Sequence, residues 1–195
     1  MTLQNGLLTP DAAYLWSDSA LWDWHGQQLV GHENKIFVGW DWPWALVHSG
    51  TNDVAAVIEF EICTAGPSSL RELVGCIRTA MRPHLDHPWP NAQRALLAAY
   101  EGGPHLLLVT TEEMAGYPPL APLPIRPQMV SGDSEAIRAE VAKGVTPDSM
   151  TRVIRQQHAD CLMEGNFPLA GTVTRARVSA EGVEMVEVDE LPVGV

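Results

Sequence analysis

Threonine at position 2 is the residue of this sequence best suited to covalent chemistry. If Met1 is removed, Thr2 carries a hydroxyl and a free α-amine on the same residue. A hydroxyl is a weak nucleophile until a base takes its proton, and an N-terminal amine can be that base. The α-amine of model peptides titrates at about 7.7–8.0, which is close enough to neutral for this role. Because threonine is common at this position, Thr2 indicates a nucleophile only if other residues support it.

Three histidines offer a different chemistry. His84 and His87 stand three residues apart in a proline-containing stretch, and His105 follows later in the chain. A zinc site needs further ligands, and the sequence does not point to any. We interpret residues 84–91 as a solvated loop, which explains the first two histidines. A metal- or ligand-binding module that uses these three histidines remains an alternative function. We expect no metal and no cofactor.

Composition limits the class of protein. The chain has 195 residues, of which 46% are hydrophobic, so it can bury a substantial core. A net charge of −12 argues against binding to nucleic acid or to an anionic membrane, which requires clustered positive charge. No apolar run is nearly long enough to span a membrane, and the first residues lack the pattern of a signal peptide. We therefore expect the protein to be located in the cytoplasm. Cys63, Cys76 and Cys161 form no paired motif, and we expect each to be a buried small hydrophobe.

The front of the chain is predicted to be a series of short strands. They cover residues 1–8, 12–17, 34–38 and 45–48, with a turn at residues 25–26. Six of the seven tryptophans lie within the first 44 residues. Core packing explains most of them, although we expect some in the loop over residues 40–44 to be exposed.

Helices and hairpins alternate through the rest of the chain. Ser69 and Glu72 form a capping box at the start of one helix. The proline-rich stretch 117–127 is interpreted as a long surface loop rather than a domain linker. The expected helices cover residues 51–62, 70–81, 134–144 and 148–162, and the expected hairpins cover 94–110 and 171–188.

This order predicts an α+β fold. Strands, two helices, a hairpin, two more helices and a final hairpin indicate two antiparallel sheets packed face to face with helix pairs outside, a four-layer αββα sandwich. We expect residues 1–195 to form a single domain.

In order and spacing, nearly the whole chain resembles the proteasome β-subunit family of N-terminal nucleophile hydrolases, including its bacterial relatives. The family's mature chain begins with a catalytic threonine, and an aspartate closes its second strand; here these positions match Thr2 and Asp18. A lysine begins the next strand, here Lys35 followed by Ile36. A small-residue strand end corresponds to Ser49 and Gly50. The stretches 98–106, 130–133 and 169–171 resemble the family's central hairpin, a later helix start and the start of its last hairpin.

The resemblance implies a role for each of these residues. Thr2 would attack a carbonyl, with its own amine as the base. Asp18 would hold Lys35 near Thr2, and backbone amides at Ser49 or Gly50 would receive the oxyanion. Ser131 would join the hydrogen bonds around the amine.

Each supporting residue also has a simpler interpretation. Asp18 is an ordinary turn residue, Lys35 an ordinary surface lysine, Ser131 a helix cap, and Ser49–Gly50 a plain turn. Taken one at a time, the simpler interpretation is the better one, and only the joint spacing favours a catalytic site.

Several positions depart from the family pattern. The usual oxyanion glycine is replaced by Ser49, and the family's first long helix is expected to be short or irregular here. Near the last hairpin, Asn166 and Leu169 stand where the family carries a supporting aspartate and serine, unless a register shift brings in Asp160.

Two functions that fit the resemblance therefore stay open, besides the metal- or ligand-binding module. The first is a threonine hydrolase that cleaves a peptide or amide substrate after removal of Met1. The second is a catalytically inactive subunit with a structural or interaction role. The resemblance also implies a homo-oligomer, as a ring or dimer, and leaves open a partner ATPase.

Overall fold

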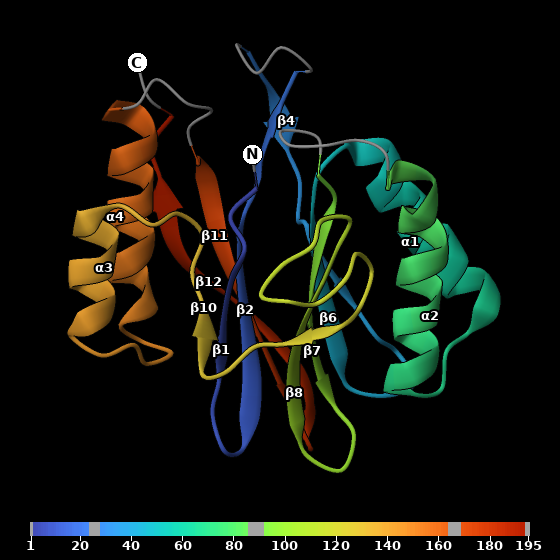
Figure 1. The fold of residues 1–195 in the computed structure, drawn as a ribbon. Coiled ribbons are helices and arrows are strands. Elements are labelled where there is room, and N and C mark those ends of the chain that lie inside the picture. The colour runs from blue at the N-terminus through green and yellow to red at the C-terminus, as the bar shows by residue number, and fades with distance from the viewer. Residues whose placement is uncertain (1, 24–27, 86–91, 164–168, 194–195) are drawn as a thin grey trace.

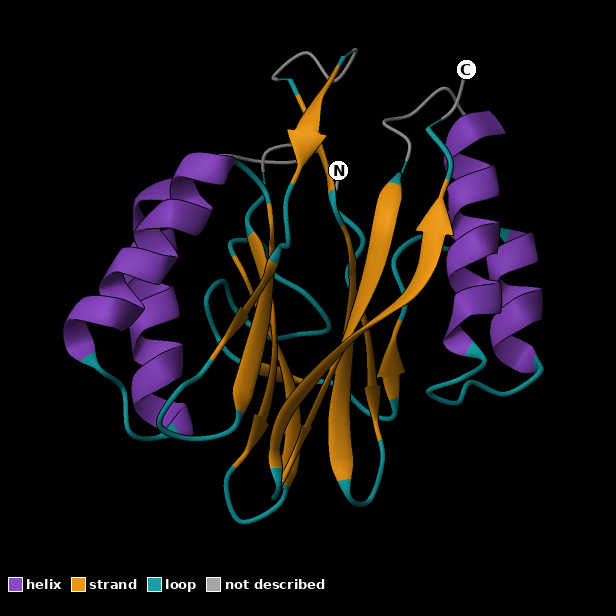
Figure 2. Ribbon diagram, turned by 180° about the vertical axis from the view of Figure 1, so that it is seen from behind, coloured by secondary structure: helices purple, strands orange, loops and turns teal. Residues whose placement is uncertain are grey.

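The computed structural model describes residues 2–23, 28–85, 92–163 and 169–193. The expected turn at residues 25–26 lies outside these ranges, as do His87, Asn166 and Met1. Within them, two five-stranded antiparallel sheets lie between two pairs of helices (Figures 1 and 2). The mixed α and β structure with antiparallel sheets that the sequence predicts is confirmed.

The first sheet contains the N-terminal segment and the C-terminal hairpin. β2 lies at its centre and pairs with β1 on one side and β11 on the other, so Trp16 lies opposite both Asn5 and Arg175. In spatial order its strands are β10 (Gln128–Met129), β1 (Asn5–Leu8), β2 (Ala12–Asp18), β11 (Gly171–Ser179) and β12 (Gly182–Leu191).

The second sheet is built from the middle of the chain. In spatial order its strands are β5 (Ile36–Val38), β6 (Trp44–Ser49), β7 (Arg94–Tyr100), β8 (Pro104–Thr110) and β9 (Leu123–Pro124). The expected surface loop 117–127 is therefore only partly a loop. β9 extends the second sheet and β10, just after it, extends the first, so this segment passes from one sheet to the other.

In the central strands β2, β6 and β7, alternating side chains are buried on both faces of the sheet. In β2, Leu15 points into the apolar cluster between the sheets, whereas Trp16 packs in a cluster with helices α3 and α4. In β6, Val47 belongs to the inner cluster and Leu46 to the cluster with α1 and α2. The central strands therefore fix the positions of the loops at their ends.

In the described ranges, four helices cover the outer faces (Figure 1). They are α1 (Asn52–Ala65), α2 (Leu70–Met81), α3 (Glu135–Ala142) and α4 (Met150–Met163), with a 3-10 turn η1 (Arg82–His84) after α2. The Ser69 N-cap is confirmed, since Ser69 Oγ accepts a hydrogen bond from Glu72 N–H at 3.3 Å. The Glu72 carboxylate, however, accepts the backbone N–H of Ser68 at 2.8 Å, one residue before the position that a capping box uses. The expectation of a short or irregular first helix is wrong: α1 runs without a break for 14 residues because Val54, Ile58 and Ile62 form a continuous buried stripe.

Other local expectations also need correction. A short ribbon of β3 (Ala20–Trp22) and β4 (Leu29–His32) follows β2 and was not predicted. Cys63 is exposed on α1, contrary to the prediction of three buried cysteines, and Cys161 is only half-buried. No helix of the described part of the chain is long and apolar enough to cross a membrane.

Candidate active site

A buried ion pair lies beside the N-terminal segment. β2 ends at Asp18, and Lys35 immediately precedes β5. Asp18 Oδ1 accepts hydrogen bonds from the backbone N–H of Leu3, at 2.8 Å, and from Lys35 Nζ, at 3.1 Å. The exposed fractions of the two side chains are 0% for Asp18 and 11% for Lys35. The pair is therefore one peptide unit from Thr2.

The charges of this pair have a clear physical consequence. Burying either charge alone is costly, so the mutual attraction and the Leu3 N–H bond hold both side chains in one geometry. An ammonium group fixed on the carboxylate that binds the Leu3 N–H opposes a second positive charge nearby and stabilises negative charge that develops there. Thr2 itself is half-buried and precedes β1.

Gln4 connects this segment to the second sheet. Its buried amide Nε2 donates hydrogen bonds to the carbonyl oxygen of Val47 at 2.9 Å and to that of Arg94 at 3.0 Å. Val47 is two residues before Ser49, just as Thr2 is two residues before Gln4. The side chain of Gln4 thus ties the N-terminal segment to the end of β6 that leads into the Ser49–Gly50 turn.

The Ser49–Gly50 turn requires glycine at its second position. Gly50 has φ of +150°, a conformation that L side chains rarely adopt, and an added Cβ would overlap the Gln93 carboxamide oxygen. That oxygen accepts the Thr51 N–H at 3.1 Å. The turn leads directly into the N-terminus of α1, where the helix dipole favours negative charge. These features suit amides that would receive an oxyanion.

His48 is a titratable neighbour that sequence reasoning missed. It is 6% exposed, and burial lowers the pKa of its imidazole to about 4, although a hydrogen bond with Gln93 and the charge of Asp53 oppose this shift. His48 is therefore neutral at neutral pH. Its Nε2 has no hydrogen-bond partner among the described residues.

Ser131 lies next to the N-terminal segment, where its hydroxyl is hydrogen-bonded to the backbone of Gln4. Its hydroxyl donates to the Gln4 carbonyl oxygen at 2.7 Å and accepts the Gln4 N–H at 3.3 Å. Its own N–H donates to Asn5 Oδ1 at 3.0 Å, and the buried amide of Gln157 bonds both Asn5 and the Ser131 carbonyl. Ser131 does not cap α3, because Ser134 does.

The remaining support positions do not supply the expected groups. Leu169 is buried, and its carbonyl oxygen lies 2.7 Å from His158 Nδ1. Asp160 is hydrogen-bonded to Ser134 and Gln156 at the start of α3, so a register shift does not bring it to Thr2.

The glutamines were also missed by sequence reasoning. In the sequence, nothing about Gln4 and Gln93 indicates a functional role, because their hydrogen-bond partners lie far away in the chain. The one signal that could have found them is a polar residue in a segment that is otherwise buried on both faces.

The histidines considered for a metal site are dispersed. His84 belongs to η1 and His105 to β8, while His87 lies outside the described ranges. Within residues that the structure describes, no group of three or more histidine, cysteine or acidic side chains could hold a metal ion.

Comparison with known proteins supports the fold and not a sequence family. No model of a known protein family matches this sequence, and no curated protein does. Among solved structures, the chain is similar to the Gly-1 mutant of Anbu from Hyphomicrobium sp. strain MC1, with a TM-score of 0.68. The sequences are 10% identical, and the alignment covers 97% of this chain and 90% of the other. The chain therefore has a proteasome-like fold.

The family assignment suggested by the sequence is corrected by these results. Membership of the proteasome β-subunit-like family of N-terminal nucleophile hydrolases is not supported, because nothing matches at the level of sequence and 10% identity shows the fold alone. Asp18 ends β2, and Lys35 immediately precedes β5. Proteins that share a fold have these strand ends at similar intervals along the chain, so the spacing of Thr2, Asp18 and Lys35 indicates the fold and not the family. The comparisons therefore support a similarity of fold alone.

Proposed function

We propose that this chain, after removal of Met1, is an N-terminal threonine hydrolase that cleaves amide or peptide bonds. The observation that carries the proposal is the buried Asp18–Lys35 pair hydrogen-bonded to the Leu3 N–H, one residue from Thr2. An ion pair is costly to bury for stability alone, and a positive charge held two hydrogen bonds from the backbone that follows Thr2 supports a role beside a hydroxyl nucleophile.

The reaction would proceed in two stages. Thr2 Oγ attacks the substrate carbonyl carbon while its α-amine takes the hydroxyl proton, directly or through water. The carbonyl oxygen becomes an oxyanion that accepts hydrogen bonds from amides at Ser49 or Gly50. The amine then protonates the leaving nitrogen as the C–N bond breaks, which leaves an ester on Thr2. Water, deprotonated by the same amine, hydrolyses that ester and releases the acid.

The other residues would act by positioning. Asp18 orients Lys35, and Asp18 Oδ2, which has no hydrogen-bond partner among the described residues, can accept a further bond. Ser131 and Gln4 fix the backbone that follows Thr2.

The proposal includes an architecture and an assembly. We infer a single domain over residues 1–195 with the four-layer αββα arrangement, supported by the three apolar clusters between sheets and helix pairs. A homo-oligomer, as a ring or dimer, and an unidentified partner ATPase belong to the same proposal.

Hydrolysis and intact mass together test the activity. The purified protein is expected to lack Met1 and to cleave a peptide amide substrate, Thr2→Ser is expected to retain activity, and Thr2→Ala is expected to lose it. Complete retention of Met1 in an active protein would exclude Thr2 as the nucleophile.

A catalytically inactive subunit is the second candidate. Leu169 stands at a support position, and the Ser131 hydroxyl is already bonded to the Gln4 carbonyl. This candidate predicts an intact Met1, no hydrolysis, and a defined oligomer by light scattering.

A further inference from the structure

The loop between β5 and β6 borders a cavity that the proposed reaction does not use. β6 runs from Trp44 to Ser49, and β5 begins just after Lys35, so the loop lies at the opposite end of this hairpin from the proposed site. Five residue steps along β6 at about 3.3 Å each separate Trp44 from Ser49 by about 17 Å. The cavity is therefore a second, separate site.

Aromatic side chains form much of the cavity lining. The cavity has a volume of about 380 Å³, which is within the range of small-molecule sites. Trp42 is half-buried and its Nε1 donates a hydrogen bond to the Pro67 carbonyl oxygen at 2.8 Å, which fixes this indole. Trp40, by contrast, is 93% exposed. The aromatic lining consists of Phe37, Trp40, Trp42 and Trp44.

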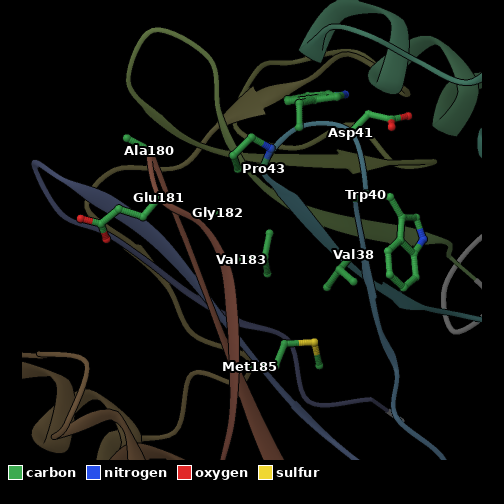
Figure 3. Close-up of a pocket in the computed structure, with 11 residues that line it drawn as sticks. Val38, Trp40, Asp41, Pro43, Ala180, Glu181, Gly182, Val183 and Met185 are labelled. Atoms are coloured by element: carbon green, nitrogen blue, oxygen red, sulfur yellow. The ribbon is translucent and has the colours of Figure 1, made fainter.

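Negative charge accompanies these rings. Asp41 and Glu59 line the same cavity and both are exposed, while none of the described lining residues is lysine, arginine or histidine. Figure 3 shows a neighbouring pocket on the other side of the loop, which Trp40 and Asp41 line together with Ala180 and Glu181 of the last hairpin. The whole chain carries a net charge of −12, which also attracts cations.

We propose that this cavity binds a small organic cation with an alkylated ammonium group. Such a cation is weakly hydrated, so it can leave water for the faces of aromatic rings, which attract positive charge. Asp41 and Glu59 would neutralise it at the rim. A neutral apolar ligand would gain nothing from these carboxylates, and a hydrated metal ion would gain little from the rings.

Calorimetric titration with choline tests the proposal on the full chain. Choline is expected to bind with a Kd of about 1 mM or tighter. Its neutral carbon isostere, in which a tert-butyl group replaces the trimethylammonium group, is expected to bind at least about tenfold more weakly. No binding of choline, or equal binding of the isostere, would overturn the proposal.

Variants assign the binding to the cavity. Trp40→Ala removes an exposed ring and is expected to weaken choline binding about tenfold. Phe60→Ala is the matched control, because Phe60 is 66% exposed and does not line the cavity, and it is expected to leave the Kd unchanged. Glu59→Gln provides a second test, with an expected loss of about threefold or more, because Glu59 lines this cavity and not the neighbouring pocket that Trp40 and Asp41 also line.

Two results for the variants would contradict the assignment. An unchanged Kd in Trp40→Ala or in Glu59→Gln would place choline outside this cavity, and so would an equal loss in Phe60→Ala. Thr2→Ala is expected to bind choline normally, so failure of the proposed hydrolysis does not affect this test.

Discussion

Acid is expected to destabilise this protein through His48. Burial lowers the pKa of the folded imidazole to about 4, whereas the pKa of an unperturbed histidine is 6.5. As pH falls below 6.5, His48 takes up a proton in the unfolded chain, whereas in the folded chain it stays neutral until about pH 4. The stability that His48 contributes is therefore full above pH 6.5 and is lost progressively as pH falls towards 4.

The size of the effect follows from the two pKa values. One pKa unit corresponds to about 1.4 kcal/mol, so between about pH 7.5 and 5 the unfolding free energy should fall by about 2 kcal/mol through His48 alone. At still lower pH the loss approaches about 3 kcal/mol. Because His48 adjoins the Ser49–Gly50 turn, its protonation should also disturb that turn.

Urea denaturation at both pH values measures this loss. His48→Gln keeps a polar side chain but does not titrate, so it should lose about 2 kcal/mol less than the native chain over this interval. Comparing the two proteins cancels the contribution of other titrating groups. An equal loss in both proteins, or an NMR titration of His48 with a pKa near 6.5, would refute the reasoning.

Two substitutions test the other contacts of the site. Lys35→Met leaves the buried Asp18 carboxylate without its cation and should cost about 3–5 kcal/mol in urea denaturation, much of which Asp18→Asn in the same chain should restore; a cost near zero would mean that the pair is solvated. Gly50→Ala should cost at least about 1 kcal/mol more than Gly66→Ala, because both glycines have positive φ but only the first would overlap Gln93; equal thermal stabilities would contradict the crowding.

Local sequence signals predicted much of the fold. The N-cap at Ser69 and the turn at residues 101–103 are short-range features whose chemistry is complete within a few residues. The β3–β4 ribbon has no such signal, since its strands have three and four residues and a register shift. The continuity of α1 depends on packing against the second sheet, which its β-branched sequence does not reveal.

The sequence also predicted only some of the residues of the candidate site. The sequence placed Thr2, Asp18 and Lys35 at suggestive intervals, and the structure brings the last two together beside the Leu3 amide. It did not reveal Gln4, whose amide reaches carbonyls 43 and 90 residues away. It also could not show that His48 is buried, because the pKa of a histidine depends on what packs around it.

Covalent labelling of Thr2 tests the central claim most directly. The purified protein is incubated with a threonine-directed electrophile, and its intact mass and N-terminal peptide are measured. The account predicts a chain without Met1 that carries one adduct on Thr2, and no adduct in Thr2→Ala. A chain that retains Met1 completely, or an adduct that persists in Thr2→Ala, would contradict it.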